Sequence, residues 1–238
     1  MHLHLLPFRT AGAAENMATD FLMLNRYPDN GYLRFRHYAW HRPAFTFGYS
    51  QKIVFVREQL PPDEKLELCR RPTGGGLVDH RNDWTYCLVI PRGHPLEEAP
   101  AGESYRTVHS AAVTALNDCG QAAMLKTECE PPGAGKVTVP TVCFTRPELH
   151  DVVHPATGAK IAGAALKRNK RGLLIQGSFD RAAVDTALDW DRFQETFAQQ
   201  LATTLATTPG PGPWPDFSEG ELDGLIEQYS SPEWNEFR

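Results

Sequence analysis

Three consecutive glycines, Gly74 to Gly76, lie between two predicted strands and constrain the fold more than any other part of the sequence. Glycine has no side chain and adopts positive φ at little cost. The backbone here can therefore lie directly against a ligand and point its N–H groups at it. Arg70 and Arg71, just upstream, could bind a phosphate with two guanidinium forks. The alternative is a glycine-rich hairpin turn flanked by solvated arginines.

The run around these glycines lacks the spacing of two common phosphate-binding motifs. No GxxxxGK[ST] sequence is present, which excludes a P-loop, and no GxGxxG sequence opens a helix, which excludes a dinucleotide-binding turn. We predict a different kind of ligand-binding loop. Its candidate substrate-binding residues are Arg70, Arg71, Thr73, Gly74, Gly75, Gly76 and His80.

Hydrophobic periodicity predicts an α+β fold. Alternation of apolar with polar residues, or enrichment in β-branched and aromatic residues, indicates five short strands, at residues 2–7, 32–38, 45–49, 66–70 and 84–90. Apolar residues at helical spacing predict helices at residues 14–24, 104–119 and 193–205. Residues 159–168 and 173–179 predict a β-hairpin closed at 169–172. We expect a mainly antiparallel mixed sheet with helices packed on it.

The C-terminal part contains a proline- and glycine-rich segment, residues 207–215, which we interpret as a stiff connector. Ser218 and Glu221 have the spacing of a capping box, which predicts a last helix. Its apolar face would consist of Leu222, Leu225, Ile226 and Tyr229. Too little chain follows the connector for a second domain, so we expect one domain over residues 1–238 without an accessory domain.

Composition excludes several classes of protein. A net charge of −5 disfavours a nucleic-acid-binding protein. No apolar run is long enough for a spanning helix, which argues against a membrane protein, and the N-terminus lacks the features of an export signal. The five cysteines include no CxxC pair, and the nine histidines show no metal-ligand spacing. We therefore expect a cytoplasmic protein with free thiols and no metal site.

Lys160 lies within a run of small and apolar residues that includes Gly163 and Ala164. A lysine in such surroundings can point into a crevice, where its ammonium could polarise a carbonyl or pair with a phosphate. The alternative is a lysine on the solvent face of an edge strand.

Cys143 precedes Phe144 after a proline-containing loop. A thiol in such a place can act as a nucleophile if a neighbouring charge lowers its pKa. The alternative is a small buried hydrophobic residue.

The predicted hairpin turn is basic, with Lys167, Arg168, Lys170 and Arg171. Such a turn is commonly a solvated tip. Its functional interpretation is a docking patch for an acidic carrier protein.

In their order along the chain, these motifs resemble those of the biotin/lipoate protein ligase and acyltransferase family. The matching segments span nearly the whole chain. They are Asn16-Met17-Ala18-Thr19-Asp20, Leu33-Arg34-Phe35 before Trp40, Gly48-Tyr49-Ser50-Gln51, Arg70 to His80, Ser104-Tyr105-Arg106, Lys160 to Ala165, Gln176-Gly177-Ser178 and Tyr229 to Trp234.

The resemblance implies a fold like the catalytic core of biotinyl protein ligases and class II aminoacyl-tRNA synthetases. The glycine loop and the strand containing Lys160, Gly163 and Ala164 would line a tunnel for an eight-carbon acyl chain, with Lys160 on the acyl carbonyl. The acceptor would be a lysine of a lipoyl domain, in an E2 subunit of a 2-oxoacid dehydrogenase or in the glycine-cleavage H protein.

Two activities within this family remain open. An octanoyltransferase takes its acyl group from acyl carrier protein onto a cysteine in a Cys-Phe pair, a place that Cys143 occupies, and needs no cofactor. A lipoate–protein ligase instead uses ATP and magnesium, with Arg70, Arg71 and the glycine loop around the phosphates. We favour the first. A third hypothesis is a non-catalytic protein that binds lipoyl domains or acyl carriers.

Overall fold

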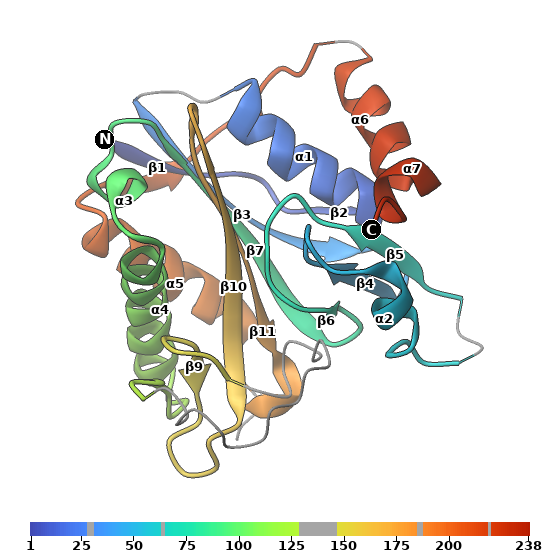
Figure 1. The fold of residues 1–238 in the computed structure, drawn as a ribbon. Helices are drawn as coiled ribbons and strands as arrows, with labels where there is room; N and C mark the ends of the chain where they lie inside the picture. Colours follow the sequence, from blue (N-terminus) through green and yellow to red (C-terminus); the bar gives the residue numbers. More distant parts are fainter. Residues whose placement is uncertain (28–30, 63–64, 129–146, 185–187, 219) are drawn as a thin grey trace.

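Two β-sheets form the framework of the protein (Figure 1). The computed structural model describes residues 1–27, 31–62, 65–128, 147–184, 188–218 and 220–238. The nine-stranded sheet has the order β12-β1-β3-β7-β11-β10-β9-β8, with β2 also paired to β3, and the three-stranded sheet has the order β5-β4-β6. The strands are β1 (His2–Leu5), β2 (Arg9–Ala11), β3 (Tyr32–Trp40), β4 (Ala44–Phe47), β5 (Glu67–Arg70), β6 (Val78–Asp79), β7 (Asp83–Pro91), β8 (Met124–Leu125), β9 (Val152–Val153), β10 (Lys160–Asn169), β11 (Gly172–Asp180) and β12 (Thr208–Pro211).

The larger sheet is mixed and mainly antiparallel, which confirms the predicted fold class. All neighbouring strands from β3 through β7, β11, β10 and β9 to β8 are antiparallel. The pairs β12–β1, β1–β3 and β2–β3 are parallel. The predicted hairpin is confirmed, since β10 and β11 pair along their length and end with Asn169 opposite Gly172.

Helices cover both faces of the larger sheet (Figure 1). Helices α4 and α5 pack on one face, and α1 and α6 on the other. The helices are α1 (Ala13–Asn25), α2 (Ile53–Arg57), α3 (Pro95–Glu98), α4 (Ala101–Asp118), α5 (Trp190–Thr204), α6 (Glu221–Ser230) and α7 (Pro232–Asn235), and Arg181–Ala183 forms a 3-10 turn, η1.

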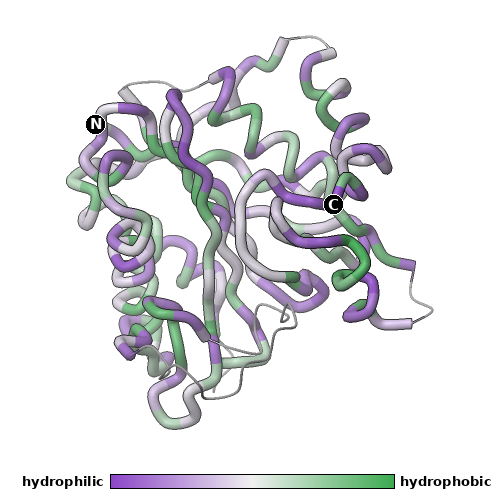
Figure 2. The backbone as a smooth tube through the Cα atoms, viewed as in Figure 1, coloured by the Kyte–Doolittle hydropathy of each residue, from purple (hydrophilic) through white to green (hydrophobic). Residues whose placement is uncertain are grey.

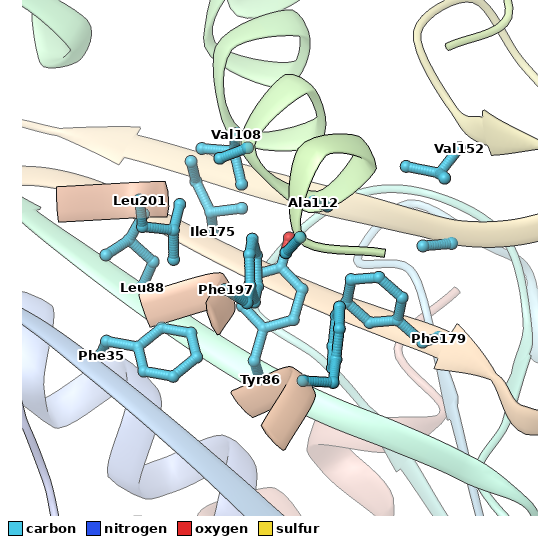
Figure 3. Packing of buried hydrophobic residues seen from close by; sticks show 14 of the residues in the cluster. Phe35, Tyr86, Leu88, Val108, Ala112, Val152, Ile175, Phe179, Phe197 and Leu201 are labelled. Atoms are coloured by element: carbon cyan, nitrogen blue, oxygen red, sulfur yellow. The ribbon is translucent and has the colours of Figure 1, made fainter. Parts of the chain in front are cut away.

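The main hydrophobic core lies between the sheet and α4 and α5. Figure 3 shows Val108 and Ala112 of α4 and Phe197 of α5 directed toward the strands, around the ring of Tyr86. The rings of Tyr86 and Phe197 meet edge to face with centroids 5.3 Å apart. Each large apolar side chain buried here contributes about 2 kcal/mol to folding. This packing makes the central strands a rigid platform for the side chains on their opposite face.

The proline-rich connector differs from its prediction. Within residues 207–215, Thr208–Pro211 forms β12, which pairs in parallel with β1 at the edge of the sheet. The N–H of Thr208 donates to Met1 O at 3.4 Å and that of Gly212 to Leu5 O at 3.0 Å. Proline has no N–H to donate, and an edge strand tolerates it because only one side of the strand needs donors.

The predicted capping box is also wrong, although the last helix exists. Gly220, with φ of 74°, is the N-cap of α6, and no side chain caps the helix. Ser218 contributes its backbone carbonyl to the N–H of Glu221. The Glu221 carboxylate instead accepts a hydrogen bond from the Tyr27 hydroxyl at 2.8 Å. This tertiary contact replaces the local one that the spacing indicated.

No helix in the described part of the chain is long and apolar enough to cross a membrane.

Candidate active site

The glycine loop connects β5 to β6, which flank β4 on opposite sides of the small sheet. The loop therefore crosses over β4, and the hairpin alternative is excluded. Gly75 has φ of 86°. A Cβ added to Gly48 would lie 2.0 Å from the carbonyl oxygen of Gly75, a distance that no real side chain tolerates. Glycine is therefore required at both positions, one for its backbone angle and one for a close approach.

Arg71 fixes the glycine loop through hydrogen bonds from its guanidinium group. Its guanidinium donates to the carbonyl oxygens of Gly74 and Gly76, each at 2.7 Å, and to that of Thr46 at 2.9 Å. Thr73 ties the loop to the larger sheet, because its hydroxyl donates to Gln176 Oε1 at 2.7 Å. These charge-assisted and buried hydrogen bonds fix the loop against the sheet.

Arg70 is placed differently from the substrate-binding position that we predicted. Its side chain is fully buried. Its guanidinium donates to four main-chain carbonyls at 2.7 to 3.1 Å, those of Tyr49, Gln51, Trp234 and Asn235. The side chain anchors the C-terminal segment to the small sheet. The sequence could not reveal this because the carbonyls it binds belong to residues far away in the chain.

A pocket lies between the glycine loop and the face of the larger sheet that carries α1. It brings together five of the predicted substrate-binding residues, Arg71, Gly75, His80, Gly163 and Ala164. The rest of its lining comes from α1, β3, β4, β6, β7, β10 and β11 and consists of Met17, Tyr38, Thr46, Val78, Thr85, Ala165, Gln176, Gly177 and Ser178. Small and apolar groups along β10 meet a few fixed polar groups, as is typical of small-molecule sites.

Lys160 is buried beside this pocket, which rules out the solvent-exposed alternative. The residue is about 5% exposed, and its ammonium lies 2.7 Å from Oδ2 of Asp151. The lysine folds over Gly163, where an added Cβ would be 2.7 Å from Nζ. The ammonium therefore lies directly beside a residue that lines the pocket. A buried cation here can attract the oxygen of a polarised carbonyl.

Asp151 is a site residue that the sequence reasoning missed. The N–H of Glu148 donates to Asp151 Oδ2 at 2.6 Å, which fixes the carboxylate. The adjacent His150 has φ of 70°, and its carbonyl oxygen lies 2.6 Å from Nδ1 of the buried His109. Asp151 directly precedes β9, in which Val153 is the register partner of Lys160, and no local pattern in the sequence singled out this carboxylate.

His80 belongs to a buried polar cluster at the pocket wall. Its Nδ1 lies 2.7 Å from Asp83 Oδ2, and its Nε2 lies 2.8 Å from the Thr46 hydroxyl. Asp83 Oδ2 also accepts hydrogen bonds from the hydroxyls of Thr85 and Ser178. Burial alone would raise the pKa of Asp83, but the neighbouring His80 and these hydrogen bonds hold it below its usual value.

Cys143, the predicted nucleophile, lies outside the described residues. Three other cysteines are described, and none lines the pocket. Burial raises the pKa of the Cys69 and Cys87 thiols, which makes both poor nucleophiles. Cys119 lies at the end of α4, where its Sγ is 3.7 Å from the Thr196 hydroxyl.

The four predicted docking residues lie at the end of the β10–β11 hairpin. Arg168, Lys170 and Arg171 are exposed, and Lys167 is half-buried. Among the described residues, no group of three or more histidine, cysteine or acidic side chains is arranged to hold a metal ion.

Residues 12–203 match the family model of the lipoyl protein ligase A/B catalytic domain. Octanoyltransferase LipM of Halalkalibacterium halodurans is 33% identical to the chain over 93% of the chain and 94% of that protein. Octanoyltransferase LipM of Staphylococcus aureus is 30% identical over 68% of the chain. That second match spans 60% of the length of the relative, less than two thirds.

Structure comparison finds the same fold in solved lipoate-protein ligases. A lipoate-protein ligase A bound with ATP superposes with a TM-score of 0.71 at 19% identity, over 99% of this chain and 98% of the other. The bipartite lipoate protein ligase of Thermoplasma acidophilum, described with its E2 lipoyl domain, gives a TM-score of 0.68 at 19% identity. That likeness covers 99% of this chain and 96% of the other.

Proposed function

This chain belongs to the family of lipoyl protein ligase A/B catalytic domains, and on that premise we propose that it transfers an octanoyl group from acyl carrier protein to a lysine of a lipoyl domain. The chain is an acyltransferase or ligase of lipoate metabolism. The relatives named octanoyltransferase support the first of these, without a nucleotide cofactor.

The observation that carries the proposal is the buried Lys160 ammonium, 2.7 Å from Asp151 and directly beside Gly163 in the wall of the pocket. Acyl transfer to an amine requires a group that stabilises negative charge on the carbonyl oxygen as the tetrahedral intermediate forms. A fixed ammonium provides this in a site from which the neighbouring apolar groups exclude water. In this proposal Lys160 acts on the acyl carbonyl, and the glycine loop covers the acyl chain.

The proposed reaction has two steps. In the first, the Cys143 thiolate attacks the carbonyl carbon of the octanoyl thioester on the carrier. A new sulfur–carbon bond forms, the bond to the carrier's phosphopantetheine sulfur breaks, and that sulfur leaves as a thiol after taking up a proton. In the second, the lysine amine of the lipoyl domain attacks the Cys143 thioester. An amide forms, the amine loses a proton, and the Cys143 sulfur is released.

The ATP-dependent ligase remains the second candidate, because a solved relative of the same fold carries ATP. In that case Arg71 and the glycine loop would surround the phosphates, and Cys143 would have no chemical role. A non-catalytic carrier-binding protein is the third. The enclosure of Lys160 and Asp151 beside the pocket argues against it, because the desolvation of a buried ion pair costs stability that their mutual attraction only partly offsets, and a binding protein without catalysis would not need that pair.

Intact mass after mixing with octanoyl carrier protein, without nucleotide, tests the proposal. We expect an added octanoyl mass that hydroxylamine removes. Cys143→Ala should abolish it, and Cys119→Ala, at a half-buried thiol outside the pocket, should leave it intact. If the lipoyl domain is modified only from free octanoate or lipoate with ATP and magnesium, with release of pyrophosphate, the protein is an ATP-dependent ligase and not an octanoyltransferase. A fully active Cys143→Ala protein would exclude the thioester.

A further inference from the structure

The end of the β10–β11 hairpin carries a cluster of cations that includes one residue the sequence alone did not indicate. Arg92, from the turn that follows β7, joins Lys170 and Arg171, because the N–H of Arg92 donates to the Arg171 carbonyl at 3.1 Å. All three side chains are exposed. Within the described part of the chain, their cationic groups form no salt bridge. We call Arg92, Lys170 and Arg171 the basic tip.

The basic tip lies at the opposite end of β10 from the candidate catalytic lysine (Figure 1). Asn169 lies six residue steps along the extended strand from Gly163, which corresponds to roughly 20 Å. Figure 2 shows that the hairpin is hydrophilic at this end and becomes hydrophobic along the strands toward the middle of the sheet. The cations are thus too far from the pocket to contact a reacting acyl group themselves.

One face of β10 connects the two places. Alternate residues of a strand share a face, so Gly163, Ala165 and Lys167 follow one another from the pocket toward the basic tip. The Lys167 ammonium lies over the Tyr49 ring, 5.5 Å from its centroid, beside the glycine loop. Arg168 points to the other face, where it donates to Ala99 O at 2.6 Å.

The separation discriminates between the two partners that an octanoyltransferase must bind. A lipoyl domain presents its acceptor amine on a lysine side chain of only four methylenes, so that domain must dock close to the mouth of the pocket. An acyl carrier protein presents its acyl group at the end of a phosphopantetheine arm, whose extended length is comparable to the distance from Gly163 to the tip. A docking surface at that distance fits the donor and not the acceptor.

We propose that the basic tip is the docking surface for an acidic acyl carrier protein, whose phosphopantetheine arm then extends along β10 to the pocket. This inference rests on the proposed octanoyl transfer. A chain of net charge −5 needs a local positive surface to bind an acidic partner, and exposed cations at a rim act mainly on the association rate. The basic tip provides that surface.

The test separates the two half-reactions. In the first, the rate of octanoyl transfer from carrier protein to the enzyme is measured against carrier concentration at low and high salt. In the second, enzyme already loaded with octanoyl transfers it to an apo lipoyl domain in a single turnover. The variant is Arg92→Glu/Lys170→Glu/Arg171→Glu, which leaves Arg168 and its bond to Ala99 intact. The single variants Lys170→Glu and Arg192→Glu make the same change in charge. Arg192 is the control position, because it is exposed at the start of α5, away from the basic tip.

We expect the triple variant to load from carrier protein about tenfold to hundredfold more slowly at low salt, with a weaker salt dependence. The second half-reaction should be unchanged, and Arg192→Glu should behave as the wild type. Unchanged loading overturns the docking proposal. A slower second half-reaction with unchanged loading also overturns it, since the tip would then serve the lipoyl domain. If the wild type binds carrier protein but forms no thioester, the proposed function fails. In that case the docking proposal is still supported if the triple charge-reversal variant no longer binds carrier protein.

Discussion

The ammonium of Lys160 is held 2.7 Å from Asp151 Oδ2, in contact with the backbone of Gly163, which has no Cβ to displace it. Lysine and aspartate come from the two sides of the short turn between β9 and β10. The arrangement fixes a flexible side chain in one position beside the pocket, and orientation of this kind is a large part of catalytic efficiency.

Removing the Asp151 charge should impair catalysis and also lower the free energy of unfolding, because the buried Lys160 ammonium loses this carboxylate. With Asp151→Asn the ammonium loses the partner that orients it, and we expect the single-turnover acyl-transfer rate to fall about tenfold to hundredfold. Lys160→Ala should reduce it by about two to three orders of magnitude, because the charge itself is lost. Asp151→Glu should recover part of the rate. Glu148→Gln, at an exposed carboxyl in the segment that precedes β9, is the control. A rate unchanged in Asp151→Asn would show that Lys160 does not need this partner.

Adding a methyl group at different glycines should separate catalysis from folding. In Gly163→Ala the new Cβ would lie 2.6 Å from Lys160 Cε, the far end of a flexible side chain that can move away. We therefore expect a rate at least about tenfold lower with nearly unchanged stability in urea.

Gly48→Ala should behave differently, because its Cβ would meet the Gly75 backbone at 2.0 Å. The glycine loop must then move, and we expect a loss of about 1 to 3 kcal/mol in the free energy of unfolding together with loss of activity. Gly74→Ala is the matched control for stability, since no atom beyond its chain neighbours lies within 4 Å of its Cβ position. Equal effects in Gly48→Ala and Gly74→Ala would contradict the close approach.

Arg70→Lys should reveal whether Arg70 is structural or binds substrate. Lysine cannot replace a guanidinium that donates to four carbonyls at once. We expect a loss of about 2 to 4 kcal/mol in the free energy of unfolding and a change in the fluorescence of Trp234, whose carbonyl Arg70 binds. Arg57→Lys, at an exposed ion pair with Glu236, should have almost no effect. If Arg70→Lys leaves the free energy of unfolding unchanged but raises the KM for the acyl donor, Arg70 binds substrate as the sequence predicted.

His37 should make stability depend on pH in the mildly acidic range. Burial lowers the pKa of His37 to about 4 in the folded protein, from 6.5 for the free side chain. The unfolded chain therefore binds a proton between these values that the folded protein does not. The contribution of His37 to the free energy of unfolding is therefore fully present above pH 6.5 and is lost as the pH falls toward 4.

Urea unfolding of wild type and His37→Gln between pH 4.5 and 7.5 measures this loss. We expect the difference between the two to change by about 1 to 3 kcal/mol over the range, less than full burial would give, because the ring is only partly buried. His41→Gln, at an exposed imidazole in the same cleft, is the control. Parallel curves for wild type and His37→Gln would contradict the prediction.

The sequence by itself located the longer strands and helices and five of the residues that line the pocket. Period-two and helical patterns located β1, β3, β7 and α1, because local burial on one face of an element leaves a periodic trace in the chain. The glycines were identifiable for a similar reason, since backbone angles and close approaches are requirements on single residues. The resemblance of ordered motifs added the family, which the comparison with residues 12–203 confirms.

Only the tertiary structure decided which partners each polar group found. Arg70 and Arg71 are adjacent in sequence, yet one anchors the C-terminal segment and the other supports the glycine loop. Asp151 pairs with Lys160, and Arg92 joins the hairpin tip, through contacts between segments that no local pattern links. Hydrogen bonds and ion pairs depend on positions in space to within a fraction of an ångström, whereas periodicity records only which side of an element is buried.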